Sequence, residues 1–407
     1  MLKTKSNLDG SGRAEDVRIL LITLLIFYVI TYFHRVMTGV MKSEIDQIAL
    51  ESSIDPDLLL AILSSVYFYA YTLAQLFVGV LIDSFGIKRI GSLFAILMFV
   101  GTFMMYFMSP QFLIFGRAVV GFSCATAFLA YQRATSLSYS SKMQGKLTSY
   151  ALLVGNLSAM IATYPLRLAL NSIGLKTFLE VMMITTLVIA TLLYSVTKDT
   201  GLNARDGKLI ETLSHFRHLI RDPHMWGLSA ASIATYGVTL AYQSAWGQKL
   251  LTESFGLSLE VSSQYLMILA LAFTLTSPVA GFLSDNVLVR RKPVIILATL
   301  TSTVSWVLML YATQASSSEA LRASLVLLGV ASGLHIVAPP MAKEGYDAKY
   351  SATSVALFNV ILFSTTAVIQ TISTLLDPRC SIRINVIIAV ASATLVTMFA
   401  RETLKRE

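Results

Sequence analysis

Charged residues are scarce in this chain. Asp, Glu, Lys and Arg make up 13% of its 407 residues, whereas 55% of the residues are hydrophobic. A soluble domain carries about 25% charged residues. Too few polar side chains remain here to cover an apolar core in water. The composition therefore excludes an ordinary soluble domain and predicts a protein whose solvent is the lipid bilayer.

Cysteine is nearly absent as well. Cys124 lies in an apolar run and Cys380 in a late loop, which excludes a disulfide framework and a cysteine metal site. The sequence also lacks a phosphate-binding glycine loop, a His-x-x-x-His spacing and a Ser/His/Asp arrangement. We therefore expect neither an enzyme nor a bound cofactor or metal.

Long apolar runs are what the chain has in abundance. Twelve of them are long enough to cross about 30 Å of hydrocarbon. They cover residues 17–40, 58–81, 90–108, 112–137, 147–170, 176–197, 225–249, 259–283, 293–313, 321–340, 351–376 and 381–400. The predicted fold is an all-α membrane protein with twelve transmembrane helices in two pseudo-symmetric six-helix bundles.

The basic residues indicate which side the loops face. With the N-terminus in the cytoplasm, the inner segments contain 22 of the 31 Lys and Arg residues and the outer segments contain seven. Such an excess is typical of cytoplasmic loops, so both termini are expected there. Because the cations follow this pattern, the net charge of +8 does not indicate nucleic-acid binding. We expect a monomeric, multi-pass protein of the cytoplasmic (inner) membrane, in contact with lipid.

The longest hydrophilic internal stretch falls in the middle of the chain and divides it in two. It carries several charges and ends before the seventh apolar run, and we expect one short amphipathic helix near 209–219 within it. The predicted organisation is a cytoplasmic tail at 1–16, a six-helix bundle at 17–197, a cytoplasmic linker at 198–224, a second bundle at 225–400 and a tail at 401–407.

One charged pattern occurs twice, half a chain length apart. Its first copy contains Gly79, Asp83, Lys88 and Arg89, and its second copy, 202 positions later, contains Gly281, Asp285, Arg290 and Arg291. The carboxylate stands at the end of a helix, where the helix dipole disfavours it unless a cation is near. Gly79 permits close packing of another helix. We interpret each copy as a breakable ionic latch; a turn that only anchors its loop in the cytoplasm is the alternative.

The two copies closely resemble the loop signature of the major facilitator superfamily, which joins the second and third helices and recurs between the eighth and ninth. Arg117 and Gly121 resemble the fourth-helix motif of that family. The resemblance covers essentially the whole chain. It implies a secondary transporter that works by alternating access, with substrate bound near the midplane between the halves. The latches are then expected to hold the outward-facing state.

Two departures from the family pattern refine this expectation. The fifth span lacks the Gly-Pro-rich motif of drug/proton antiporters, which disfavours multidrug export, and Leu288 stands where the first latch has Gly86, which is expected to weaken the second latch. Stretches around Arg35, at 66–75 and at 353–359 resemble bacterial carriers related to lysosomal dipeptide carriers and to amino-acid transporters of intracellular bacteria.

Arg35 is the first candidate for a substrate ligand, because an ionisable residue inside a span is costly unless it has a function. Tyr28 lies on the same helical face. The alternative is that Arg35 lies nearer the outer interface and extends its charge into the headgroups. The position 202 residues later is Gly237, so the two halves are expected to form an asymmetric site.

Further candidates follow from polar side chains at helical spacing within the spans. They are Tyr67, Tyr71 and Gln75 in the second span, Arg133 in the fourth, Tyr236, Gln243 and Trp246 in the seventh, and Asn359 in the eleventh. Packing is the alternative for the aromatic residues, and capping the cytoplasmic helix end is the alternative for Arg133.

The spans also lack a central Asp or Glu. Arginine without a nearby carboxylate disfavours organic cations and suits a substrate with a carboxylate or phosphate, which arginine binds through two parallel hydrogen bonds. Proton coupling, if present, is expected to use His34, His335 or Glu344. His34 is alternatively a packed residue, and transport without protons remains open.

The sequence thus predicts transport of a small solute with a carboxylate, specifically an amino acid or a short peptide. Transport of an organic or phosphorylated anion, or export of a chelating metabolite, is the alternative within the same class. A membrane receptor with the same fold is the alternative outside it.

Overall fold

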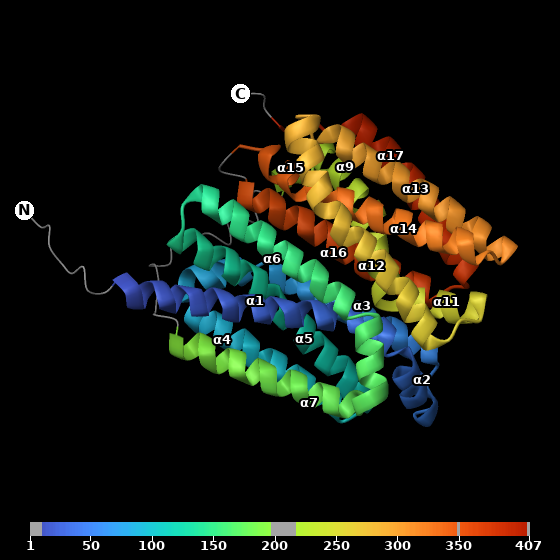
Figure 1. Ribbon diagram of the computed structural model, residues 1–407, viewed down its shortest axis with the longest axis horizontal. Coiled ribbons are helices and arrows are strands. Elements are labelled where there is room, and N and C mark those ends of the chain that lie inside the picture. The colour runs from blue at the N-terminus through green and yellow to red at the C-terminus, as the bar shows by residue number, and fades with distance from the viewer. Residues whose placement is uncertain (1–9, 197–216, 348–350, 405–407) are drawn as a thin grey trace, which may run out of the picture.

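The computed structural model describes residues 10–196, 217–347 and 351–404. Within these ranges the chain forms helices and no β-strand. Figure 1 shows the helices of the first half, in blue to green, packed beside those of the second half, in yellow to red. The predicted all-α membrane fold is confirmed.

The first half runs from α1 to α7. Its helices are α1 (Gly10–Val40), α2 (Lys42–Glu51), α3 (Pro56–Gln75), α4 (Val78–Tyr106), α5 (Pro110–Ser138), α6 (Ser141–Ile161) and α7 (Tyr164–Val196). The short helix α2 lies at the end of the half opposite to the start of α1 (Figure 1). We call that end of the molecule the α2 end, and the end where α1 begins and α17 finishes the termini end.

The second half is more interrupted. It contains α9 (Pro223–Ser232), η1 (Ile233–Gly237), α10 (Val238–Ala241), η2 (Tyr242–Trp246), α11 (Gly247–Phe255), α12 (Leu259–Phe282), η3 (Leu283–Val287), α13 (Lys292–Ala315), α14 (Ser318–Leu334), η4 (His335–Val337), α15 (Ala338–Glu344), α16 (Ser351–Leu375) and α17 (Pro378–Phe399). The segments η1, η2 and η3 are π-helical turns, and η4 is a 3₁₀ turn. Turns of this kind inside long helices frequently mark functional sites.

Ten of the described helices are long and apolar enough to cross a membrane. The helix α6 and the broken stretch from α9 to α11 occupy the places of the predicted fifth and seventh spans. The first candidate span, Glu15–Val40, agrees with the predicted run at 17–40 to within two residues, although its helix α1 begins at Gly10. The end of the predicted fifth span was wrong, because α6 ends at Ile161 rather than near 170. Positions 198–216 of the predicted linker, with most of its amphipathic helix, lie outside the described residues.

The two copies of the charged pattern differ in backbone conformation at the turn between their helices. In the first copy Gly86, with φ of 82°, breaks an otherwise continuous α4. Glycine adopts such a backbone without a Cβ clash. The second copy lacks this glycine, and there the helix widens into η3 and Val289 takes a φ of 49°. A β-branched residue in that region is strained.

Close packing between helices does not occur at every small residue. Nothing lies within 4 Å of the position where a Cβ on Gly79 would be, so the predicted helix contact at Gly79 is wrong. A Cβ on Gly39 of α1, in contrast, would lie 3.0 Å from the backbone oxygen of Gln243 in η2. The two halves meet here, and also where α3 packs on α16 and α6 on α12.

Candidate substrate-binding site

Arg35 lies in α1 at the junction of the two halves. Its side chain is buried, with the whole residue 4% exposed. Its Nη1 donates a hydrogen bond of 3.5 Å to the Tyr236 hydroxyl of η1 in the other half. Its guanidinium carbon lies 4.8 Å from the Tyr32 ring centre, 5.1 Å from that of Tyr71 and 5.5 Å from that of Phe363. Besides α1 itself, α3 of the first half and η1 and α16 of the second half therefore contribute side chains around the Arg35 cation.

The charge of Arg35 is incompletely compensated. Among the described residues it has no acidic partner, and its Nε has no hydrogen-bond partner. Burial of an unpaired ion costs several kcal/mol, and each cation–π contact offsets about 0.5–2 kcal/mol of that. An anion placed beside Arg35 would therefore compensate its charge.

Tyr236 connects Arg35 to a buried histidine. The Tyr236 ring stacks on the His335 ring with centroids 5.2 Å apart and planes 5° from parallel. His335 starts the 3₁₀ turn η4 and is itself buried, and its Nδ1 has no hydrogen-bond partner among the described residues. Two unpartnered nitrogens, on Arg35 and His335, thus flank one tyrosine.

The aromatic candidates of the first half divide into two roles. Tyr28 donates a hydrogen bond of 3.2 Å to the hydroxyl of Tyr32, and the ring of Tyr32 contacts the Arg35 guanidinium. Tyr28 is therefore connected to Arg35 through Tyr32. Tyr71 contacts Arg35 directly, whereas Tyr67 is fully buried and donates to the Thr31 carbonyl at 3.4 Å.

Other candidates lie farther from Arg35. Gln243 is buried in η2 with an unpartnered Nε2, and the Trp246 ring stacks on Trp306 with centroids 5.7 Å apart, inside the second half. Gln75 is the half-buried last residue of α3, and Asn359 is half-buried on α16. None of these four has a described contact with Arg35.

His34 faces away from this cluster. Its Nε2 lies 3.4 Å from Thr102 Oγ1 in α4, and its backbone oxygen accepts a hydrogen bond of 2.6 Å from Arg117. Arg117 also donates to the Leu63 carbonyl at 3.1 Å, and thus ties α5 to α1 and α3. Among the described residues, His34 and Arg117 belong to the core of the first half.

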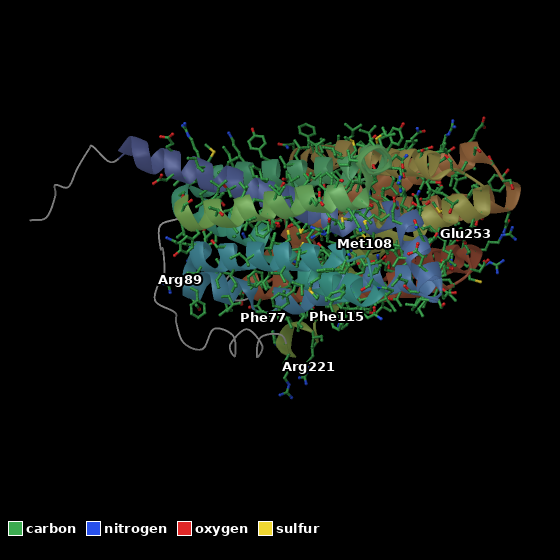
Figure 2. All side chains as sticks on the ribbon, turned by 90° about the horizontal axis from the view of Figure 1, so that it is seen from below. Phe77, Arg89, Met108, Phe115, Arg221 and Glu253 are labelled. Carbon is green, nitrogen blue, oxygen red and sulfur yellow. The ribbon has the colours of Figure 1, made fainter. Side chains whose placement is uncertain are left out.

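The residues of the two charged turns lie at the termini end, and the ion pairs that the structure describes for them each stay within one half. Arg133 Nε is 3.1 Å from the Asp83 carboxylate, and Arg291 is 3.0 Å from Glu344 and 3.9 Å from Asp285. Lys88 lies over the Tyr194 ring at 4.7 Å. Arg89 and Arg290 are exposed, and Figure 2 shows Arg89 at the opposite end from Glu253. Arg133 therefore contacts the carboxylate of the first charged turn and not the Arg35 cluster.

The α2 end, in contrast, is bridged between halves. Lys249 of α11 is 2.6 Å from Asp57 of α3 and donates to the Thr374 carbonyl at 2.8 Å. Lys42 of α2 pairs with Asp46 at 2.7 Å and lies 3.8 Å from Glu253 of α11.

A second bridge at the α2 end runs through Asn171. This residue donates to Glu260 of the other half at 2.8 Å. Arg167 donates a hydrogen bond of 2.9 Å to the side-chain oxygen of Asn171 and two hydrogen bonds to the carboxylate of Glu44. The α2 end is thus closed by charged and polar pairs that cross between the halves.

Several of these residues were not predicted. Tyr32 carried a usable signal, because it lies three residues before Arg35 and four after Tyr28 on one helical face. Phe363, Asp57 and Lys249 carried none, since their contacts depend on how the second half packs against the first. In the sequence, Lys249 was only one of the seven basic residues of the outer segments.

A family model described as Major Facilitator Superfamily matches residues 20–369, most of the chain. The chain belongs to the Major Facilitator Superfamily. Membership accounts for two similar halves that each carry a charged turn at the termini end. No curated protein matches the sequence significantly.

Solved structures of the superfamily share this fold at low sequence identity. A D-xylose–proton symporter superposes with a TM-score of 0.77 at 13% identity, covering 95% of this chain and 98% of the symporter. The xylose transporter XylE from E. coli, inward open, gives 0.76 at 13% identity with 95% and 97% covered. A bacterial homologue of the human lysosomal transporter Spinster, inward-facing and occupied, gives 0.68 at 16% identity with 93% and 95% covered.

Proposed function

We propose that this superfamily member carries a small carboxylate-bearing solute, an amino acid or a short peptide, across the membrane by alternating access. One observation supports the proposal above all others. Arg35 is a buried cation without an acidic partner among the described residues, and both halves contribute to its surroundings. A carboxylate there would meet the guanidinium and the Tyr236 hydroxyl together, so substrate binding would join the halves.

An organic or phosphorylated anion is the second candidate. The described neighbours of Arg35 are aromatic side chains, and none of them is a carboxylate that would pair with a substrate amino group. This composition favours the anionic part of a substrate over its cationic part. Amino acids, peptides and organic acids therefore belong in the same transport screen.

We infer the orientation of the chain from its basic residues. The excess of Lys and Arg at the termini end supports a cytoplasmic location for that end. The ion pairs that cross between the halves then close the outer face, as in an inward-facing transporter. Two of the structural neighbours are inward-facing forms, which supports this assignment.

For proton coupling, His335 is the residue to test first. It stacks on the tyrosine that binds Arg35, so a change in its charge would reach the substrate site directly. His34 is separated from the site because its ring faces α4. Glu344 pairs with Arg291 in the second latch, which links it to opening of the termini end. One structural neighbour is a proton symporter.

The test is substrate uptake into proteoliposomes with a matched arginine control. Arg35→Ala is expected to lower uptake about thirtyfold or more, since loss of one partner of a desolvated charge pair costs at least about 2 kcal/mol. Arg322→Ala is the control, because Arg322 also lies over a tyrosine ring, Tyr265 at 5.6 Å, but on the surface of the second half. Undiminished uptake by a folded Arg35→Ala protein would refute the proposal.

A further inference from the structure

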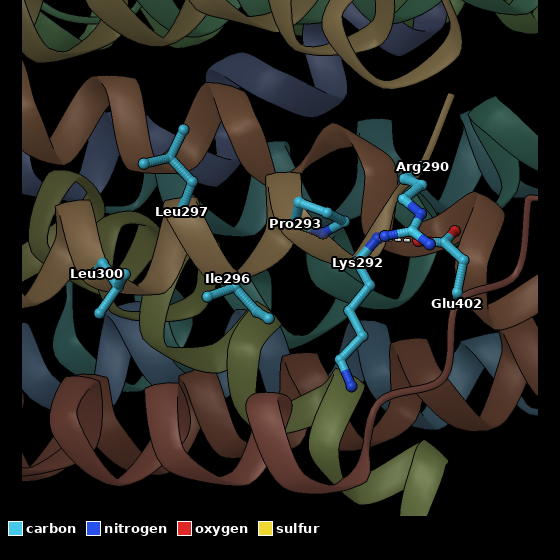
Figure 3. A pocket seen from close by; sticks show the side chains of 7 residues that line it. All are labelled: Arg290, Lys292, Pro293, Ile296, Leu297, Leu300 and Glu402. Carbon is cyan, nitrogen blue, oxygen red and sulfur yellow. Dashed lines mark hydrogen bonds between the residues drawn. The ribbon is translucent and has the colours of Figure 1, made fainter. Parts of the chain in front are cut away.

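A hollow of about 470 Å³ opens beside the N-terminal end of α13, at the termini end of the second half. Figure 3 shows its lining: two cations and a carboxylate at one end, and apolar side chains along α13 toward the other. The residues that matter are Arg290, Lys292, Glu402, Ile296, Leu297 and Leu300.

The polar and apolar parts of the hollow follow the membrane depth. Helix α13 is one of the described spans, so its first turn lies near the headgroups and its next turns lie in the hydrocarbon. From Lys292 to Leu300 the helix rises roughly 12 Å. Leu297 and Leu300 are 46% and 50% exposed, as expected of side chains that face lipid. The hollow therefore begins at headgroup level and continues along an acyl-chain surface.

The two cations of the hollow are unpaired. Neither the Arg290 guanidinium nor the Lys292 ammonium has an ion-pair or hydrogen-bond partner among the described residues. Their neighbour Arg291 differs, because its guanidinium is committed to Glu344 at 3.0 Å. Positive charge is thus left over at the mouth of the hollow.

The carboxylate of Glu402 does not cancel this charge. It accepts hydrogen bonds from the backbone N–H groups of Arg291 at 2.9 Å and of Lys292 at 3.1 Å. Burial alone would raise the pKa of Glu402, but these and further backbone hydrogen bonds outweigh burial and leave the pKa lowered. Glu402 therefore stays ionised and caps α13, with its charge directed at the helix N-terminus.

We propose that this hollow binds an anionic phospholipid. Its phosphate would lie between Arg290 and Lys292, and one acyl chain would lie along Ile296, Leu297 and Leu300. A zwitterionic lipid would bring a second cation to the same place and fit less well. Arg291 of the second charged turn lies between Arg290 and Lys292 in sequence, and Glu402 accepts hydrogen bonds from the backbone of Arg291 and Lys292. A lipid bound here would therefore stabilise the second half at the termini end. The proposal is independent of the transported substrate.

Lipid binding can be measured as a shift in thermal unfolding of the detergent-purified full chain. The probes are dioctanoyl phosphatidylglycerol, dioctanoyl phosphatidylcholine, glycerophosphoglycerol and inorganic phosphate. Only the first probe is expected to raise the melting temperature at micromolar to low millimolar concentration. The variant Arg290→Gln/Lys292→Gln should weaken its apparent affinity by on the order of tenfold or more, given the contribution of each basic residue near an anionic lipid.

Lys343→Gln is the matched control, since Lys343 is an exposed lysine at the same end of the same half but does not line the hollow. It should keep the wild-type response. Arg290→Gln alone serves if the double variant is unstable, because this exposed side chain makes no described contact. Equal affinity in wild type and Arg290→Gln would overturn the proposal. So would an equal response to phosphatidylcholine, or full reproduction of the effect by inorganic phosphate.

Discussion

The two ends of this molecule use the same kinds of side chain for opposite arrangements. At the α2 end, Lys249 and Asp57 belong to different halves and lie 2.6 Å apart. At the termini end, Asp83 pairs with Arg133 inside the first half, and Arg291 with Glu344 inside the second. Both ends contain charged residues, but only at the α2 end do the described ion pairs connect one half to the other. The sequence shows the charges at both ends, but it does not show which residue each charge pairs with.

Burial determines how much each pair contributes. The Lys249 side chain is 6% exposed, so its ammonium depends on Asp57 and the Thr374 carbonyl for compensation. The Asp83–Arg133 pair is about one-third exposed on both sides, where ion pairs contribute about 0–1 kcal/mol. We therefore expect the α2 end to respond more strongly to charge removal.

The largest effect is expected from Asp57→Asn. Breaking a buried ion pair on one side costs about 3–5 kcal/mol, and we expect about 2 kcal/mol here because Asp57 is 33% exposed. Spin labels at Glu51 and Ser254, in a variant without Cys124 and Cys380, should report a population with a longer distance across the α2 end.

Two variants control this prediction. Asp83→Asn should leave the Glu51–Ser254 distance distribution unchanged, since Asp83 lies at the opposite end and its described partner Arg133 belongs to the same half. The exchange Asp57→Lys/Lys249→Asp should restore the short distance only in part, because an Asp at position 249 cannot donate to the Thr374 carbonyl. If Asp57→Asn and Asp83→Asn act alike, the contrast between the two ends is wrong.

A smaller effect is expected from Gly39→Ala. The added Cβ would lie 3.0–3.3 Å from the backbone of residues 243–245, which cannot move aside like a flexible side chain. Overpacking of this kind costs about 1–3 kcal/mol, and here it acts only when the α2 end is closed. The same spin labels should show partial opening. Gly79→Ala is the matched control, because nothing lies within 4 Å of its Cβ position.

The smallest effect concerns pH. In the closed α2 end, burial raises the pKa of Glu253, with Asp57 and Asp46 adding to the shift and Lys249 and Lys42 opposing it. A raised pKa in the closed form means that this form binds the proton more tightly, so lowering the pH favours closure and raising it through the shifted pKa removes that contribution.

The population of the short Glu51–Ser254 distance should therefore rise modestly on acidification. Glu253→Gln should be more closed at neutral pH and lose this part of the pH dependence. Opening on acidification that disappears in Glu253→Gln would show the opposite sign and contradict the assignment.

Much of the fold was predictable because hydrophobic runs and a repeated charged turn are local signals. The twelve apolar runs and the copies at Asp83 and Asp285 predicted the superfamily fold. The interruptions of the seventh span at η1 and η2 were not predictable, since nothing in the residues from 225 to 249 distinguishes a π turn from a regular one. Likewise, Leu288 in place of a glycine indicated that the second copy differs from the first, but the strained backbone at Val289 could not be predicted from it.

The candidate site was partly predictable for the same reason. Arg35 was apparent because a cation inside an apolar run is costly, and Tyr28, Tyr71 and Tyr236 followed from helical spacing and the repeat. Phe363 and Asp57 were missed because their roles arise from contacts between halves. Arg133 showed the limit of reading one span alone: its partner Asp83 lies in another helix, 50 residues earlier.

The central claim is that Arg35 binds the anionic group of the substrate. The most direct measurement compares the affinity of the best-bound carboxylate, from a panel of amino acids, dipeptides and organic acids, with that of its neutral amide. Wild type should prefer the carboxylate by about tenfold or more, and Arg35→Gln should bind both with similar affinity. An Arg35→Gln protein that keeps the full preference for the carboxylate would contradict the account.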